Sequence, residues 1–301
     1  MASSKMDQLK ETMKQMMAVG FAPKFDGSVD VDVLRTTING AQKRMPTEPG
    51  VTFETINYGG IDGEINHPQE EDDSAIILYI HGGGLITGDA FSSRGYGSVL
   101  AAESGFPVYT VSYRLAPENP FPACYEDCYH FYQAIAAKYQ DKPVYLVGES
   151  GGAYLCLAVS MIARDNGIKS PAAIAPYSVP IDFTGHIDRT SAKDQDFTIN
   201  ADGMNWLKSL LDPEGKFVNE KYAHPYLDDM KGMPPMFLAW DDNEHLAIDQ
   251  EILAEKVKAA GGEVECKAYP DCFHAFATAN RGTPESYEIL RNTIAFFKAH
   301  K

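Results

Sequence analysis

The chain has 301 residues, of which 44% are hydrophobic and 23% are charged, a composition typical of globular proteins. This length is near the upper limit for a single hydrophobic core and favours one domain with an added lid. The 42 acidic residues outnumber the 26 basic ones and give a formal charge of -16, which excludes nucleic acid and anionic membrane surfaces as expected partners.

The N-terminus and the cysteines both favour a cytoplasmic protein. Residues 1–20 contain neither an uninterrupted apolar core nor a cleavage-like site, and the longest apolar stretch, residues 75–80, is too short to insert across a bilayer. Five scattered cysteines do not suit a disulfide framework. Cys124 and Cys128 lie four apart on an expected helix, but a zinc site needs two more nearby ligands, so we expect inert thiols and no metal.

Expected helices and strands alternate along most of the chain. Residues 5–19 have apolar, mostly methionine side chains at helical spacing, which predicts a helix that packs on the body, covers a ligand pocket as a mobile lid, or does both. Strands are expected at 51–58, 63–68, 74–80, 106–113, 142–148, 234–240 and 263–269, and further helices at 123–139, 151–165, 248–260 and 284–299. This order predicts an α/β fold with a mostly parallel sheet flanked by helices and an antiparallel meander at one edge.

Residues 181–222 break this alternation. They form a polar, irregular stretch around one short helix, which we interpret as an insertion above the sheet and the second part of a lid. In open sheets of this kind, the active groups lie on loops beyond the carboxyl ends of the strands.

Two glycine-rich segments follow expected strands. Residues 148–152 fit the pattern G-x-S-x-G between a strand and a helix, the setting in which Ser150 is held exposed as a nucleophile. Residues 81–84 read His-Gly-Gly-Gly, and such a loop can turn backbone N–H groups into a cavity where they stabilise an oxyanion. A tight turn with an idle serine and a flexible hinge are the structural alternatives.

A nucleophilic serine needs a histidine base and an acid that orients it, in the chain order serine, acid, histidine for this layout. Of the histidines after Ser150, only His274 lies in a loop after the last strand, whereas His186 and His224 fall in the expected lid. The acid is open at this stage, because several carboxylates follow the strand at 234–240: Asp241, Asp242, Glu244 and Asp249.

Three segments together resemble the hormone-sensitive-lipase branch of the α/β-hydrolase esterases: HGGG at 81–84, SYRLAPENPFPA at 112–123 and GESGG at 148–152. The resemblance begins near residue 50 and implies an α/β-hydrolase domain over 46–301, with residues 1–45 as a helical lid segment. Its register implies that Glu244 is the acid, with Asp241 and Asp242 as alternatives, and that Gly83, Gly84 and Gly151 form the oxyanion hole. Within residues 112–123, we expect Arg114 to pair with Glu118 and to support the oxyanion loop.

The sequence therefore predicts a serine carboxylesterase that hydrolyses short-chain acyl esters, from acetyl to about hexanoyl, through an acyl-enzyme intermediate. No cofactor is expected, the partner is a small-molecule ester, and a homodimer is possible. An amidase or formamidase with the same triad is the nearer alternative. A non-catalytic small-molecule receptor on this scaffold is the more distant one.

Overall fold

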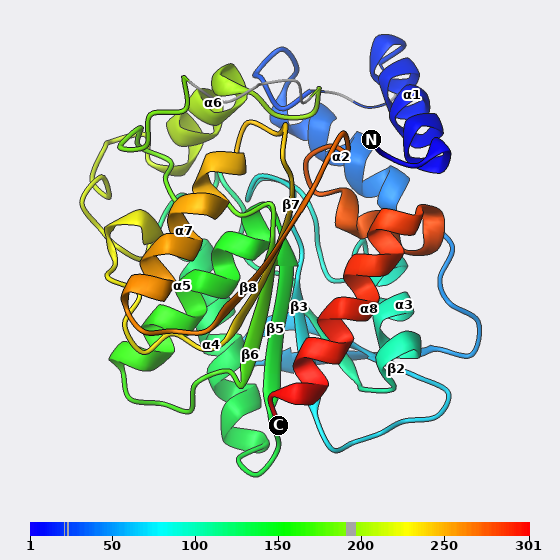
Figure 1. Ribbon diagram of the computed structural model, residues 1–301, viewed down its shortest axis with the longest axis vertical. Helices are drawn as coiled ribbons and strands as arrows, with labels where there is room; N and C mark the ends of the chain where they lie inside the picture. The colour runs from blue at the N-terminus through cyan, green and yellow to red at the C-terminus, as the bar shows by residue number, and fades with distance from the viewer. Residues whose placement is uncertain (21, 23, 191–196) are drawn as a thin grey trace.

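The structure is a computed structural model that describes all residues except 21, 23 and 191–196. A twisted eight-stranded sheet runs through its centre, in the strand order β1-β2-β4-β3-β5-β6-β7-β8 (Figure 1). The strands are β1 (Thr52–Tyr58), β2 (Ile61–His67), β3 (Ile76–Ile80), β4 (Val108–Val111), β5 (Val144–Glu149), β6 (Ala173–Tyr177), β7 (Met236–Asp241) and β8 (Val264–Tyr269). β2 runs antiparallel to β1 and β4, and all other pairs are parallel, which confirms the predicted sheet and its antiparallel edge.

Helices cover both faces of the sheet (Figure 1). They are α1 (Ser4–Ala18), α2 (Val31–Gln42), α3 (Arg94–Ser104), α4 (Ala123–Lys138), α5 (Gly151–Asp165), α6 (Ala201–Leu211), α7 (Ala247–Ala259) and α8 (Pro284–Ala299), with short 3-10 turns at Pro225–Leu227 and Phe276–Gly282. Side chains of α4, α5 and α7 belong to one apolar core, and those of α3 and α8 belong to the other. Among the described residues, no helix is long and apolar enough to cross a membrane.

The central strands are apolar throughout because both faces of the sheet are covered. In β3, Ile76, Leu78 and Ile80 point into one core, whereas Ile77 and Tyr79 point into the other. Because successive side chains of a strand alternate between faces, a strand covered on both sides must be apolar at every position. The predicted strand at 74–80 owes its continuous apolar run to this double burial.

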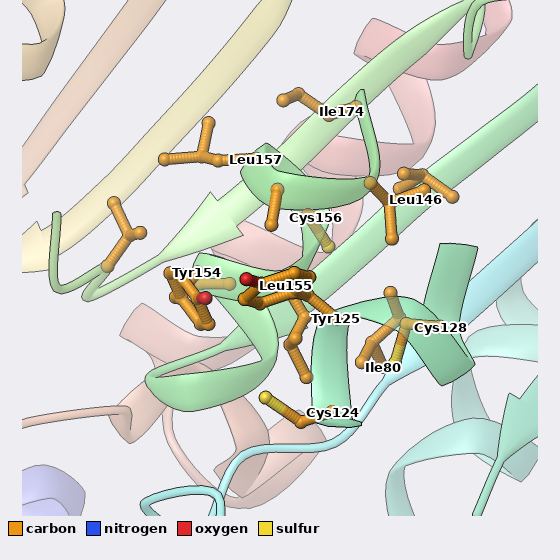
Figure 2. Packing of buried hydrophobic residues seen from close by; sticks show 14 of the residues in the cluster. Ile80, Cys124, Tyr125, Cys128, Leu146, Tyr154, Leu155, Cys156, Leu157 and Ile174 are labelled. Carbon is orange, nitrogen blue, oxygen red and sulfur yellow. The ribbon is translucent and has the colours of Figure 1, made fainter. Parts of the chain in front are cut away.

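Three cysteines lie in the core between α4, α5 and the sheet (Figure 2). Cys124 and Cys128 of α4 and Cys156 of α5 are free thiols, packed among aromatic and aliphatic side chains such as Tyr125 and Leu155. Burial raises the pKa of all three thiols well above the usual range, which keeps them protonated and unreactive.

α1, α2 and α6, which we call the cap helices, lie together beyond one end of the sheet (Figure 1). The predicted helix at 5–19 is present as α1, and the Ser3 hydroxyl caps it by accepting from the Met6 N–H. Met6 is fully buried in the core beside α8, so one part of the methionine face packs on the body. The action of these helices as a lid stays a prediction.

Candidate active site

Ser150 lies in a sharp turn between β5 and α5. Its backbone has φ 53° and ψ -122°, a conformation that is strained for a residue with a side chain. The Ser150 N–H donates to the carbonyl of Tyr177 in the neighbouring strand at 2.9 Å, which helps to hold the turn. Gly152 is required by close packing, because a Cβ there would lie 2.0 Å from the carbonyl oxygen of Ile80.

Three residues that are far apart in the sequence form one hydrogen-bonded chain. The Ser150 hydroxyl donates to His274 Nε2 at 2.7 Å, and His274 Nδ1–H donates to Glu244 Oε2 at 3.0 Å. They come from loops that follow β5, β7 and β8, and because these strands are parallel, their carboxyl ends lie at the same end of the sheet. The glutamate side chain is fully buried, so its carboxylate can fix the imidazole in the tautomer that accepts a proton from serine.

The neighbouring residues Asp241 and Asp242 have other contacts in the structure. Asp241 is buried at the end of β7, and its Oδ1 accepts from the backbone N–H of Cys272 at 3.0 Å. The Asp242 N–H donates to the carbonyl of Tyr269 at 2.9 Å. Asp241 therefore holds the loop that leads to His274, whereas Glu244 contacts the imidazole itself.

The glycine loop at 81–84 lies beside Ser150. Gly83 and Gly84 both have positive φ, 95° and 64°, and line the same cavity as Ser150. The carbonyl oxygen of Gly83 accepts from Ile86 N and Thr87 N, so this oxygen points toward the residues that follow the loop. Gly151 begins α5, so its N–H is one of the first donors of that helix.

Glu149, directly before the nucleophile, is a buried residue to which the sequence assigned no role. Its Oε1 accepts from the Gly82 N–H at 2.7 Å and from the Tyr79 hydroxyl at 3.1 Å. Burial raises the pKa of this carboxyl to about 7, although both hydrogen bonds and the nearby His274 favour its charged form. A glutamate beside a serine is visible in the sequence, but its contact with a loop 67 residues away is not.

The triad opens into a cavity of about 300 Å³ beneath the cap helices. Its walls include Met13 and Met17 of α1, Ile38 of α2 and Leu207 of α6. The methionine face of α1 therefore has two parts, because Met6 packs in the core while these two side chains line the cavity.

The expected pair of Arg114 and Glu118 is wrong. Arg114 makes a bidentate ion pair with Asp127 of α4, and Glu118 pairs instead with Arg35 of α2. Arg35 also donates to the carbonyls of Ile86 and Ala116, so α2 is attached both to the oxyanion loop and to the 112–123 segment. The spacing of four suggested a local pair, but tertiary packing brings each charge a more distant partner.

The expected placement of His186 and His224 away from the triad holds. His186 lies within residues 181–222 and His224 just after them, and both are near Asp182. Burial lowers the pKa of His224 to about 4. Among the residues that the structure describes, no group of three or more His, Cys, Asp or Glu side chains is arranged to hold a metal ion.

Comparisons with known proteins identify the family of this chain. A family profile described as an alpha/beta hydrolase fold matches residues 77–278, a range that contains the triad and the glycine loop. The chain is 28% identical to an acetyl-hydrolase of Streptomyces hygroscopicus over 277 residues (89% of this chain, 90% of the relative) and 27% identical to a carboxylesterase of Mycobacterium tuberculosis over 305 residues (94% of each). The crystal structure of an esterase from the bacterial hormone-sensitive lipase family matches with a TM-score of 0.90 at 26% identity, covering 100% of this chain and 99% of that one.

Proposed function

This chain belongs to the α/β-hydrolase fold family and is a carboxylic ester hydrolase, and from that premise we propose that it cleaves short-chain acyl esters, from acetyl to about hexanoyl, through an acyl-enzyme on Ser150. The observation that carries the proposal is the hydrogen-bonded chain from Ser150 through His274 to Glu244 at the base of a cavity beneath the cap helices.

In the first half of the reaction, the Ser150 oxygen attacks the acyl carbon while its proton passes to His274 Nε2. The carbonyl oxygen becomes an oxyanion, which the N–H groups of Gly83, Gly84 and Gly151 stabilise. As this intermediate collapses, the bond to the alcohol oxygen breaks, and His274 returns the proton to that oxygen. An alcohol leaves, and the acyl group stays on Ser150 as an ester.

In the second half, water takes the place of the alcohol. His274 Nε2 accepts a proton from the water as its oxygen attacks the acyl carbon, and a second oxyanion forms in the same site. Collapse breaks the bond to Ser150, whose oxygen recovers the proton from His274. The carboxylic acid leaves, and Glu244 stabilises the positive imidazolium in both halves.

The size of the cavity supports the short acyl chain. A volume of about 300 Å³ is at the lower end of the range for ligand pockets, and the cap helices close its far side with apolar side chains. The name of the acetyl-hydrolase relative agrees with this substrate class.

The test is a series of p-nitrophenyl esters from acetate to laurate, measured with the wild type and with Ser150→Ala. We expect kcat/KM to be highest between acetate and hexanoate, and a loss of at least about 10³-fold in the alanine variant. Undiminished activity of Ser150→Ala would contradict the role of the serine, and a maximum at decanoate or beyond would contradict the short chain. A folded wild type without activity on any ester would instead favour a receptor.

The same triad can cleave amides, so the leaving group needs its own comparison. Matched p-nitrophenyl acetate and p-nitroacetanilide differ only in the leaving atom. We expect kcat/KM to be at least about 10³-fold higher for the ester, because an anilide is the less reactive acyl donor. An equal or higher value for the amide would make the enzyme an amidase.

A further inference from the structure

Glu149 joins the strand that carries the nucleophile to the loop that carries the oxyanion donors. It is the last residue of β5, is 8% exposed, and accepts from the Gly82 N–H through Oε1. The two segments are in direct contact, because a Cβ on Gly82 would lie 2.7 Å from the carbonyl oxygen of Glu149 and 3.0 Å from Oε1. A longer side chain at position 82 would therefore separate the loop from β5.

The peptide between His81 and Gly82 is held at both of its polar atoms. Its N–H donates to Glu149 Oε1 at 2.7 Å, and its carbonyl oxygen accepts from the Tyr113 hydroxyl at 2.9 Å. The next peptide, between Gly82 and Gly83, carries the Gly83 N–H. Fixing the His81–Gly82 peptide therefore restricts the direction in which this donor can point. The peptide that carries the Gly84 N–H is held through its carbonyl, because the Gly83 oxygen accepts from Ile86 N and Thr87 N.

The Glu149 carboxylate also lies beside the residues that react with the substrate. Glu149 lines the cavity together with Ser150 and His274, and its second oxygen, Oε2, has no hydrogen-bond partner among the described residues. Leaving such an oxygen buried costs free energy.

We propose that Glu149 is a positioning residue that fixes the His81–Gly82 peptide and thereby directs the N–H groups of Gly83 and Gly84 at the oxyanion. This inference rests on the proposed function, because it presupposes the Ser150 nucleophile and the glycine oxyanion site. Glu149 acts through Gly82 and makes no bond to the substrate.

The test compares Glu149→Ala with Glu149→Gln, with kcat expressed per site that a phosphonate ester titrates, so that misfolded protein is not counted. We expect Glu149→Ala to lower kcat about 10- to 100-fold with KM within about threefold, because removal of a whole oxyanion donor costs about 10²- to 10³-fold in kcat. Glu149→Gln keeps an acceptor for the Gly82 N–H and should recover most of the loss. Asp228→Asn, a buried carboxylate paired with Arg164 and remote from the triad, is the matched control and should keep the wild-type kcat.

A second measurement separates positioning from a general structural effect. A trifluoromethyl ketone forms a tetrahedral adduct with the serine, whereas the matching methyl ketone binds largely as an intact carbonyl. We expect Glu149→Ala to raise the inhibition constant of the trifluoromethyl ketone by about the same factor as it lowers kcat/KM, and to leave that of the methyl ketone within about threefold.

If Glu149→Ala does not fold, Tyr113→Phe tests the same peptide from its carbonyl side and should give the same pattern with a smaller loss. A wild-type kcat per titrated site in whichever of these variants folds would overturn the inference, and so would a change confined to KM. Ser150→Ala keeps the two proposals apart: if it is inactive while Glu149→Ala is fully active, only the positioning role is wrong.

Discussion

Replacing Glu244 by glutamine tests the part of the triad that the sequence left most open. The carboxylate lies 3.0 Å from His274 Nδ1 and is fully buried, so no water can take over its role. A glutamine amide can present its NH2 group to Nδ1, which would leave the imidazole proton on Nε2, facing Ser150. In that tautomer the ring cannot accept the serine proton.

The magnitude follows from this geometry. Loss of the correct tautomer in a serine triad lowers kcat about 10⁴-fold, and we expect about 10³- to 10⁴-fold for Glu244→Gln. That range corresponds to about 4 to 5.5 kcal/mol of lost transition-state stabilisation. KM should change little, because Glu244 lies behind the imidazole and away from the substrate.

The assay is hydrolysis of p-nitrophenyl butyrate by Glu244→Gln, Asp241→Asn and Asp242→Asn under identical conditions. Asp241→Asn retains an oxygen that can accept from Cys272 N, so we expect a loss of less than about tenfold, and a smaller one still for Asp242→Asn. Far-UV circular dichroism should show the wild-type fold in all three. A larger loss in either asparagine variant than in Glu244→Gln would refute the assignment of the acid.

Three further outcomes follow from other parts of the structure. Burial raises the pKa of Glu149 from 4.5 to about 7, so the native state binds this proton more tightly than the unfolded state, and the stability that the group contributes is complete below pH 4.5 and is lost as the pH rises through 7. In urea unfolding, Glu149→Gln should therefore gain up to about 3 kcal/mol in free energy of unfolding relative to the wild type between pH 4.5 and pH 8. A difference that does not depend on pH would contradict this. Arg189 makes a bidentate pair with the fully buried Asp249, so Arg189→Ala should lower the free energy of unfolding by about 3 to 5 kcal/mol in a urea titration, and a loss under about 1 kcal/mol would show that the pair is not needed. Leu207 lines the cavity, whereas Leu211 of the same helix is buried outside it. Leu207→Ala should therefore raise the ratio of kcat/KM for the octanoate ester over the butyrate ester at least about threefold, and Leu211→Ala should leave this ratio unchanged.

The sequence predicted the parts of this fold that carry strong periodic signals. Continuous apolar runs mark the doubly covered strands, and the glycines around Ser150 mark a turn that close packing demands. Both features are local consequences of burial, so they are visible without the partner segments. The resemblance to an esterase family added Glu244, which no local pattern distinguishes from Asp241 or Asp242.

The missed elements are those that tertiary contacts create. α2 has β-branched residues and a glycine, and it is attached to the body by the fully buried Leu34 and by the bonds of Arg35. β6 is a five-residue strand with two alanines and Pro176, yet it lies between β5 and β7 in the middle of the sheet. In both cases weak local preference is overridden by packing, and the same holds for the partners of Arg114 and Glu118.

The carboxyl end of β5 brings together two features that each cost stability. Ser150 has a strained backbone, and Glu149 is a buried carboxyl with one unpaired oxygen. Such features persist only where the surrounding structure over-determines them. β5 meets this condition, because it pairs along its length with β3 and β6 and is buried at every position, and the glycine loop continues directly from β3. A strand that is paired on both sides and buried at every position therefore supports both the nucleophile and the residue that we propose orients the oxyanion donors.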